Sequence, residues 1–350
     1  MQRIKIGSKY IGENDPIYII AEMSGNHGGS LEIALQILRA AAKSGADAVK
    51  LQTYTADTIT LNSDKEDFHL PEESPWTESK TFYQLYSEAF TPWEWHEALF
   101  DEANKLGVDI FSSPFDESAV DLLEELGACA YKIASPEVTH IPLLKKVAAT
   151  KKPVIVSTGV AELSDIELAI KTLRENGCNE IIILKCSTVY PAAPEFLNLR
   201  TIPNIEQTFG VIPGFSDHSI GIAASIVAVA LGAKVIEKHF TLTSKDKSVD
   251  SFFSLEASEF ERMIKEIRVA EKSLGVIRYE LDTNGKNSSR GRRSLYISAD
   301  IKAGEKITKQ NIKCVRPAFG LHPKYWEEVI GRKVRKNLEA GDRLRLEDIE

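Results

Sequence analysis

One unit is repeated along this chain: a continuous apolar run that ends in polar residues is followed by a segment of helical character. Continuous apolar runs are typical of strands buried on both faces, as in parallel sheets. Eight such runs occur, at residues 17–22, 48–52, 108–113, 130–135, 154–158, 181–186, 210–215 and 233–236. Eight strand–helix units in about 260 residues predict a (β/α)8 TIM barrel, and a doubly wound open sheet is the alternative. No Gly-x-Gly-x-x-Gly motif follows the first run, so a dinucleotide site of that kind has no support.

The segments outside the repeat predict further parts. Residues 1–12 alternate in polarity and predict a hairpin that covers the barrel floor. The long acidic insertion at 55–80 has two interpretations, a functional lid or a solvated spacer. A barrel domain is expected over 1–281, a polar linker over 282–293, and a small, mainly β domain over 294–350.

Two histidines follow the last two predicted strands, in Ser216-Asp217-His218 and Glu237-Lys238-His239-Phe240. The apolar segment between them predicts one helix, so the two strands form a βαβ unit with their carboxyl ends side by side. Two imidazoles in that position could share one cation. The alternative is that each histidine caps its strand through a local hydrogen bond.

Polar side chains are dense at the expected strand ends, where a barrel of this type places its active site. They are Glu22, Lys50, Gln52, Ser113, Lys132, Ser135, Glu137, Ser157, Thr158, Lys185, Ser216, His218 and His239. Several lysines with several hydroxyls predict a cradle for phosphate or carboxylate, although a lysine there could also form an ion pair with Glu22 or Glu137. Two chemistries remain open: a Schiff base on a lysine, or a metal ion that polarises a carbonyl while the lysines bind an anionic donor.

Composition narrows the class of protein. The net charge is −8 and the basic residues are dispersed, which argues against nucleic-acid binding. The four cysteines show no CxxC spacing, so a reduced cytoplasmic protein is expected and neither a disulfide scaffold nor a zinc ribbon is. The longest apolar stretch, 220–235, is too short to cross a membrane.

The motifs themselves resemble the sialic acid synthase family. The resemblance rests on Ile20-Ala21-Glu22-Met23-Ser24-Gly25-Asn26-His27, Lys50-Leu51-Gln52-Thr53, Ser112-Ser113-Pro114-Phe115-Asp116, Tyr131-Lys132-Ile133-Ala134-Ser135, Ser157-Thr158-Gly159, Gly214-Phe215-Ser216-Asp217-His218 and Glu237-Lys238-His239-Phe240. The tail, with Arg293-Ser294-Leu295-Tyr296 and Arg316-Pro317-Ala318-Phe319-Gly320, resembles that family's C-terminal antifreeze-like (SAF) domain. Within the family, the segments 22–27, 51–57 and 91–96 are most similar to the branch that makes pseudaminic acid.

The resemblance implies condensation of phosphoenolpyruvate with an open-chain amino sugar, which yields a nine-carbon 2-keto acid and phosphate. For the pseudaminic branch the acceptor would be 2,4-diacetamido-2,4,6-trideoxy-altrose. It further implies a divalent metal ion, Mn²⁺ first and Mg²⁺ or Co²⁺ as alternatives, and a domain-swapped homodimer. The sister activities that make N-acetylneuraminic or legionaminic acid are the nearest alternative, and a carbohydrate-binding module on an inactive barrel is a more distant one.

The resemblance also implies roles for individual residues. His218 and His239 match the metal ligands, Glu22 a carboxylate near the donor that could position or deprotonate water, and Asp250 a carboxylate that could handle a sugar hydroxyl. Arg316 matches an arginine that the SAF domain inserts into the partner subunit's active site. Donor and sugar contacts are expected from Lys50, Gln52, Ser113, Lys132, Ser135, Glu137, Ser157, Tyr190 and Ser216.

Two departures from the family pattern concern these roles. Ala318 stands where the family has glycine after Arg-Pro, and 246–250 lacks the glycines expected before Asp250. His27, in the first predicted loop, could touch the sugar or orient its own loop.

Overall fold

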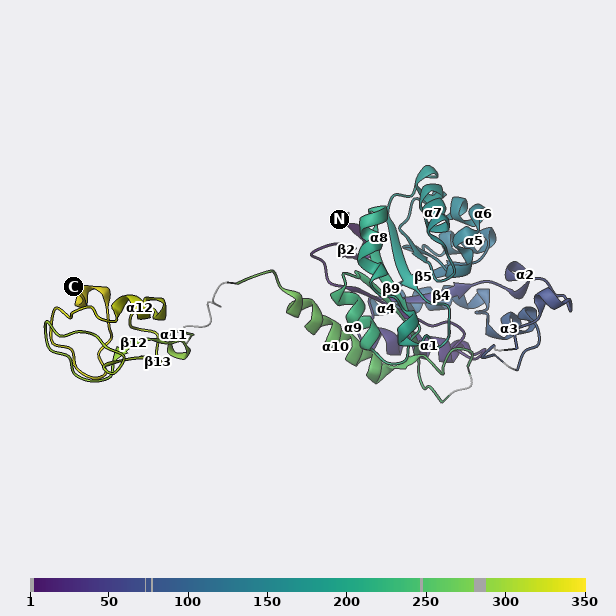
Figure 1. Cartoon of the computed structure of the whole chain (residues 1–350). Helices are drawn as coiled ribbons and strands as arrows, with labels where there is room; N and C mark the ends of the chain where they lie inside the picture. Colours follow the sequence, from purple (N-terminus) through teal and green to yellow (C-terminus); the bar gives the residue numbers. More distant parts are fainter. Residues whose placement is uncertain (1–2, 73, 77, 246–247, 280–287) are drawn as a thin grey trace. The chain divides into compact units, whose positions relative to one another are not determined.

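Figure 1 shows the computed structural model of the chain, which describes residues 3–72, 74–76, 78–245, 248–279 and 288–350. The chain divides into two compact units, Met1–Gly275 and Val276–Glu350, each described here by itself. Part of the predicted linker, 282–287, lies outside the described residues, and a short helix, α11 (Ser288–Gly291), occupies most of the rest.

The first unit is a closed barrel of eight parallel strands. They are β3 (Tyr18–Glu22), β4 (Ala48–Thr53), β5 (Asp109–Pro114), β6 (Tyr131–Ile133), β7 (Val154–Ser157), β8 (Ile181–Cys186), β9 (Ile212–Asp217) and β10 (Val235–Thr241). Each strand pairs in parallel with the next along the chain, and β10 pairs with β3 to close the ring. The predicted (β/α)8 barrel is therefore confirmed, and the open sheet is excluded because an open sheet would leave two unpaired edges.

A helix follows every strand and packs outside the ring (Figure 1). These helices are α1 (Leu31–Lys43), α4 (His96–Leu106), α5 (Glu117–Glu125), α6 (Ile141–Ala149), α7 (Leu163–Glu175), α8 (Thr201–Phe209), α9 (Ala223–Ala230) and α10 (Ala257–Leu274). A short parallel strand, β11 (Leu255–Glu256), pairs with β10 just before α10. Both faces of the sheet are covered in this way, which explains the unbroken apolar runs.

At three strands the carboxyl end differs from the sequence prediction by two residues or more. β9 continues through Asp217 and β10 through Thr241, so Ser216, Glu237 and His239 lie within strands rather than after them. The fourth strand was expected to reach Ser135, but β6 ends at Ile133 and Ser135 begins a 3-10 helix, η3 (Ser135–Thr139). Pro136 explains this difference, because proline lacks the amide hydrogen that a strand needs and suits the first turn of a helix.

The predicted hairpin at the barrel floor is present as β1 (Ile4–Ile6) and β2 (Lys9–Ile11). Ile4, Ile6 and Ile11 are at most 1% exposed and pack with residues at the starts of the strands, such as Tyr18 and Val235. The amino end of the barrel is thereby filled with apolar side chains, which leaves the carboxyl end for polar ones.

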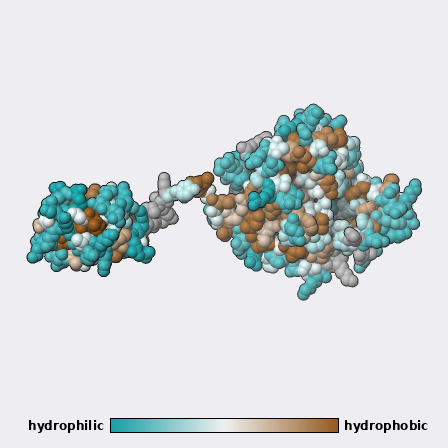
Figure 2. Space-filling view, viewed as in Figure 1, coloured by the Kyte–Doolittle hydropathy of each residue, from teal (hydrophilic) through white to brown (hydrophobic). Residues whose placement is uncertain are grey.

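The insertion between β4 and β5 carries most of the irregular structure of this unit. It contains α2 (Ala56–Ile59), η1 (Glu66–Phe68), α3 (Phe82–Ala89) and η2 (Trp93–Trp95). In the view of Figure 2 the outer surface of this insertion is mostly hydrophilic.

The second unit has its own small core. β12 (Ser294–Ile297) pairs antiparallel with β13 (Ile312–Val315), and short helices η5 (Pro323–Tyr325), α12 (Trp326–Val329) and η6 (Leu346–Asp348) follow. A bridge between Ile301 and Leu338 joins the two segments that precede the pairs Ala303-Gly304 and Ala340-Gly341. Over both units, none of the helices within the described residues combines the length and the apolar character that a membrane span requires.

Candidate active site

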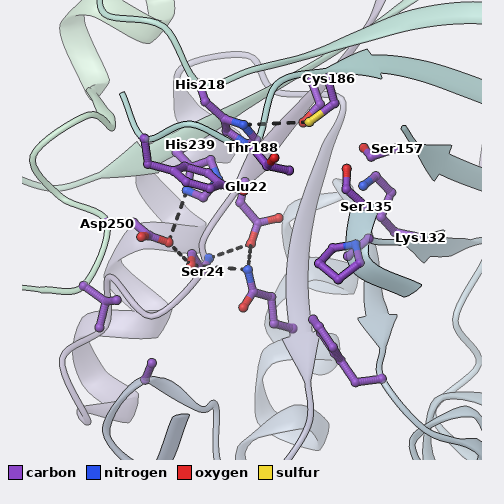
Figure 3. Close-up of a pocket in the computed structure, with 18 of the residues that line it drawn as sticks. Glu22, Ser24, Lys132, Ser135, Ser157, Cys186, Thr188, His218, His239 and Asp250 are labelled. Carbon is purple, nitrogen blue, oxygen red and sulfur yellow. Dashed lines mark hydrogen bonds and ion pairs between the residues drawn. The ribbon is translucent and has the colours of Figure 1, made fainter. Parts of the chain in front are cut away.

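A cavity of about 310 Å³ opens at the carboxyl ends of the barrel strands. Most of the residues that the sequence predicts for the site line it: Glu22, Lys50, Gln52, Lys132, Ser135, Ser157, Tyr190, Ser216, His218, His239 and Asp250. In Figure 3, His218, His239 and Asp250 lie on one side, Lys132, Ser135 and Ser157 lie on the other, and Glu22 and Ser24 lie between them.

Two lysines and two glutamates meet at the bottom of the cavity, all of them at least 96% buried. Lys50 forms an ion pair with Glu22 and lies 3.8 Å from Glu237 Oε2, while Lys132 Nζ lies 3.6 Å from Glu237 Oε1. The hydroxyl of Ser216 donates to Glu237 Oε1 at 2.9 Å. The ion pair that the sequence left open for a strand-end lysine is thus present, and it links four strands.

Burial and neighbouring charge act differently on the two glutamates. Burial outweighs the nearby lysines at Glu22 and raises the pKa of that carboxyl. At Glu237 burial is opposed by Lys132 and Lys50, which together hold its pKa below the ordinary value. Glu237 therefore remains the ionised partner of both lysines, and Glu22 is the carboxyl that accepts a proton more readily.

Hydroxyl groups gather beside Lys132. Ser135 Oγ accepts a hydrogen bond from the amide of Gly159 at 2.9 Å. Ser157 Oγ is buried and has no hydrogen-bond partner among the described residues. Because an unpaired buried hydroxyl is costly unless a ligand satisfies it, this corner fits an oxyanion held by Lys132 and the two serines.

The two histidines face one another at the cavity wall, with ring centroids 5.2 Å apart. His218 Nδ1 lies 2.6 Å from the carbonyl oxygen of Ser187, to which it donates, so Nε2 keeps its lone pair. His239 Nδ1 is buried without a hydrogen-bond partner among the described residues and lies 3.6 Å from Asp250 Oδ2. Burial, the largest cause, lowers the pKa of His239, so its ring stays neutral.

Neutral imidazole nitrogens with free lone pairs are the groups that a divalent cation requires, so His218 and His239 fit a metal ion. Within the described parts of the chain, no group of three His, Cys, Asp or Glu side chains is arranged to hold an ion. A metal ion held by the two histidines would therefore take its remaining ligands from oxygens of substrate or water.

The carboxylates near the histidines are connected through Ser24, which the sequence analysis did not single out. Its hydroxyl donates to Asp250 Oδ2 at 2.5 Å and its amide donates to Glu22 Oε1 at 2.8 Å. Gln52 Nε2 also donates to Glu22 Oε1, at 3.2 Å. Asp250 thus belongs to the site even though the residues before it depart from the family pattern.

A buried ion pair behind the histidines holds their two strands together. Lys238 Nζ lies 3.0 Å from Asp217 Oδ2, which also accepts from Ser225 on α9 at 2.6 Å. Successive side chains along a strand point to opposite faces. His218 and His239 point into the cavity, so Asp217 and Lys238, which directly precede them, point away from it.

The loops close the cavity with aromatic rings. The ring of Tyr190 packs 4.5 Å from His218 and 5.9 Å from Trp76, and Trp76 Nε1 donates to the carbonyl of Val249 at 2.9 Å. Trp76 lines the cavity and comes from the 55–80 insertion, so this insertion contributes to the site and is more than a spacer.

Six predicted residues do not line the cavity, among them Thr158 and Lys185, which donate to carbonyl groups of β8. Ser113 accepts a hydrogen bond from Lys50 at 3.3 Å without lining the cavity, and Glu137, two residues after Ser135 on η3, does not line it either. His27 contacts Thr91 at 3.1 Å and the amide of Gly29 at 3.1 Å, which agrees with its loop-orienting interpretation. Arg316 is exposed on the second unit, directly after β13.

Several cavity residues were missed by the sequence analysis. Glu237 could have been found, because it lies two residues before His239 and so points to the same side of β10. Ser24 lies two residues after Glu22, the last residue of β3, and could have been found in the same way. Tyr54, Phe82, Leu85, Tyr86, Ala89 and Phe115, which also line the cavity, carry no polarity that distinguishes them from core residues.

A closed parallel barrel whose cavity combines buried lysines and serines with two histidines, together with a small β unit, defines a two-domain barrel enzyme. The chain belongs to the NeuB family, whose family model matches residues 37–279, and the SAF domain model matches residues 292–350.

Individual relatives cover almost the whole chain. A pseudaminic acid synthase of Campylobacter jejuni is 46% identical over 332 residues, which cover 95% of this chain and 96% of the relative. An N,N'-diacetyllegionaminic acid synthase of the same species is 37% identical over 331 residues, 93% of this chain and 98% of the relative. The crystal structure of the Bacillus subtilis spore coat polysaccharide biosynthesis protein SpsE superposes with a TM-score of 0.69 at 34% identity, covering 100% of this chain and 99% of that one.

Proposed function

We propose that this protein is a pseudaminic acid synthase, which condenses phosphoenolpyruvate with 2,4-diacetamido-2,4,6-trideoxy-altrose and releases phosphate. The observation that carries the proposal is the 46% identity with a pseudaminic acid synthase along 95% of the chain, against 37% with a legionaminic acid synthase. Members of the NeuB family condense phosphoenolpyruvate with a sugar, and the cavity described above has the charges that this donor requires.

The donor would lie across the lysine side of the cavity. Lys132, Ser135 and Ser157 would hold its phosphate, because they supply one cation and two hydroxyls at one corner. Lys50 and Ser216 would hold its carboxylate. Both lysines already have glutamate partners, so donor binding replaces or shares those contacts rather than meeting bare charges.

Synthases of the NeuB family generally depend on a metal ion. His218 and His239 would hold it in this chain, and we favour Mn²⁺, with Mg²⁺ and Co²⁺ as alternatives. Bound there, a divalent cation would polarise the aldehyde carbonyl of the acceptor. Asp250, 3.6 Å from His239 and held by Ser24, would contact a hydroxyl of the sugar.

The reaction forms one carbon–carbon bond. Carbon 3 of phosphoenolpyruvate attacks the aldehyde carbon, whose oxygen takes up a proton and becomes a hydroxyl. Water adds to the resulting cation at carbon 2 and gives its proton to a base, the role that we propose for Glu22 in the cavity lining. The carbon–oxygen bond to phosphate then breaks, and phosphate leaves as the 2-keto acid forms.

The second unit would complete the site in a homodimer. Arg316 is exposed at the end of β13, and in the proposed domain-swapped arrangement it enters the cavity of the other subunit. The four cysteines are all free, which suits a reducing compartment, so the proposed place of action is the cytoplasm.

Phosphate release from phosphoenolpyruvate tests this function directly. The purified protein would be assayed with Mn²⁺ or with EDTA against three acceptors: the diacetamido-altrose, its manno-configured counterpart and N-acetylmannosamine. Release with the first acceptor alone, lost in EDTA and restored by Mn²⁺, is expected.

The other outcomes separate the alternatives. Preference for the manno-configured sugar or for N-acetylmannosamine would assign a sister activity. Release that ignores EDTA, together with trapping of a covalent adduct by borohydride, would favour the Schiff base. Sugar binding without phosphate release would favour a binding module.

A further inference from the structure

Helix α3 presents an apolar stripe to the cavity. Phe82, Leu85, Tyr86 and Ala89 all line the cavity, and their spacing of three and four residues places them on one face of the helix. Gln84, Ser87 and Glu88 lie on the opposite face and are exposed.

This stripe serves the cavity rather than the core. Leu85 and Ala89 are 7% and 8% exposed, yet among the described residues neither belongs to the clusters that form the barrel core. An apolar helix face normally packs on another element of the fold. Here it forms one wall of a cavity that also contains the buried lysines and glutamates.

Aromatic contacts fix the wall before any ligand binds. The ring of Tyr54 packs 5.7 Å from Tyr86 and 5.0 Å from Phe115, and Phe82 stacks on Tyr86 at 6.0 Å. At the start of the helix, Thr81 and Gln84 form reciprocal side-chain to backbone bonds, both at 3.3 Å. Because the wall is held on both sides, its apolar surface is a permanent feature of the cavity.

Phosphoenolpyruvate cannot use such a wall, since it is charged at both ends. The acceptor must therefore use it. The aldehyde end of the acceptor has to lie near Glu22 and the histidines, so the far end of its carbon chain points away from them. Tyr54 connects the two regions: its ring packs against Tyr86 and Phe115, and burial followed by the charge of Asp250 raises the pKa of its hydroxyl.

We infer that the α3 wall, formed by Phe82, Leu85, Tyr86, Ala89 and Phe115, is the subsite for the C6 methyl group of a 6-deoxy sugar and selects it over a 6-hydroxy sugar. This inference deepens the proposed function and rests on it. Among the five side chains of the wall only Tyr86 carries a hydrogen-bonding group, so a hydroxyl at carbon 6 would lose most of its hydrogen bonds to water. The altro- and manno-configured diacetamido sugars both carry this methyl group, so the wall selects the class and leaves the configuration to other contacts.

The test compares acceptors that differ only at carbon 6. The ratio of kcat/KM for the 6-deoxy sugar to that for its 6-hydroxy counterpart is measured by phosphate release. The unmodified protein is expected to prefer the 6-deoxy sugar about 100-fold, the usual range for an apolar pocket that meets an added hydroxyl. Leu85→Asn should lower this ratio at least about tenfold, through loss of activity on the 6-deoxy sugar, and leave the KM for phosphoenolpyruvate unchanged.

Three further variants test whether a changed kcat/KM ratio comes from the wall itself. Leu168→Asn makes the same change at an exposed leucine on α7, 47% accessible, and should leave the ratio unchanged. Leu85→Met preserves an apolar wall and should preserve the ratio. Phe82→Tyr adds one hydroxyl to a half-buried ring and should shift the ratio toward the 6-hydroxy sugar even if Leu85→Asn does not fold.

The outcomes for the wall and for the proposed function are separable. A 6-deoxy preference below about threefold, or a ratio unchanged in both Leu85→Asn and Phe82→Tyr, would overturn the inference. If another configuration is the better acceptor, the proposed function fails, and the same pair of sugars in that configuration still tests the wall. If no acceptor supports phosphate release, the ratio of the calorimetric affinities for the pair in the presence of phosphoenolpyruvate tests the wall instead, and equal affinities would overturn the inference.

Discussion

At the scale of single residues, burial decides which carboxyl groups keep their protons. Glu137 lies on η3 with one carboxylate oxygen buried and without a hydrogen-bond partner among the described residues. Burial raises its pKa to about 7, although a backbone hydrogen bond and Lys132 act in the opposite direction. Glu237 is buried more deeply, yet its two lysine partners keep its pKa low.

The raised pKa of Glu137 predicts a stability that falls as pH rises. In the unfolded chain the carboxyl loses its proton near the ordinary value of 4.5, whereas the folded protein holds it to about 7. The contribution of the protonated group is complete below the lower value and is lost as pH rises through the higher one. Glu137→Gln should therefore be more stable than the unmodified protein at about pH 8, by on the order of 3 kcal/mol, and similar to it at about pH 5.

Urea unfolding of the ligand-free protein at the two pH values measures this difference. Glu125→Gln, at the exposed end of α5, is the matched control and should show little change at either pH. An equal effect of Glu137→Gln at both pH values would mean that the carboxylate ionises without cost in the folded protein.

At the scale of elements, the hairpin β1–β2 carries stability and takes no part in chemistry. Ile6 is 0% exposed and fills the amino end of the barrel, while its neighbour Lys5 points outward and is exposed. Ile6→Ala should lower the free energy of unfolding by about 2–5 kcal/mol, because a cavity is left among side chains that cannot collapse into it. The KM values for both substrates should stay as they were.

Lys5→Ala on the same strand is the control, with an expected change within about 0.5 kcal/mol. Denaturant unfolding and steady-state kinetics on both variants make the comparison. A change in KM with Ile6→Ala would show that the floor of the barrel reaches the substrates, contrary to this interpretation.

For the strands, the apolar pattern of the sequence was sufficient to find each element but not to find where it ends. Runs of buried residues located all eight strands, because each strand is covered on both faces and leaves no alternation to misread. Their ends were less certain. The polar residues Ser216, Glu237 and His239 were expected beyond the strands but belong to them, since main-chain pairing with the neighbouring strand continues past the last apolar side chain.

At the scale of the whole molecule, a prediction concerns whether one chain supplies every residue of its own active site. The first unit contains every predicted site residue except Arg316, which belongs to the second. If Arg316 acts in the other subunit, two inactive variants should restore activity together. In a 1:1 mixture of unfolded Arg316→Ala and His239→Ala chains, refolding should yield about a quarter of the unmodified activity, because half of the dimers are mixed and each has one intact site.

Each variant refolded alone should be inactive and serves as the control for the mixture. Size-exclusion chromatography of the mixture checks that dimers have formed. Activity no greater than that of the single variants would place Arg316 in the site of its own chain or outside any site.

The sequence by itself determined the class of fold and the main chemistry of the cavity. Strands buried on both faces must be apolar throughout, so polar residues such as Lys50, Lys132 and His239 are visible against them, and the barrel topology requires their carboxyl ends to converge. The tertiary structure alone decided which lysine pairs with which glutamate, that Ser24 links Glu22 to Asp250, and that α3 turns its apolar face to the cavity. Those features depend on distances across the barrel and on the direction of one helix face, and an apolar stripe has the same periodicity whether it faces a core or a substrate.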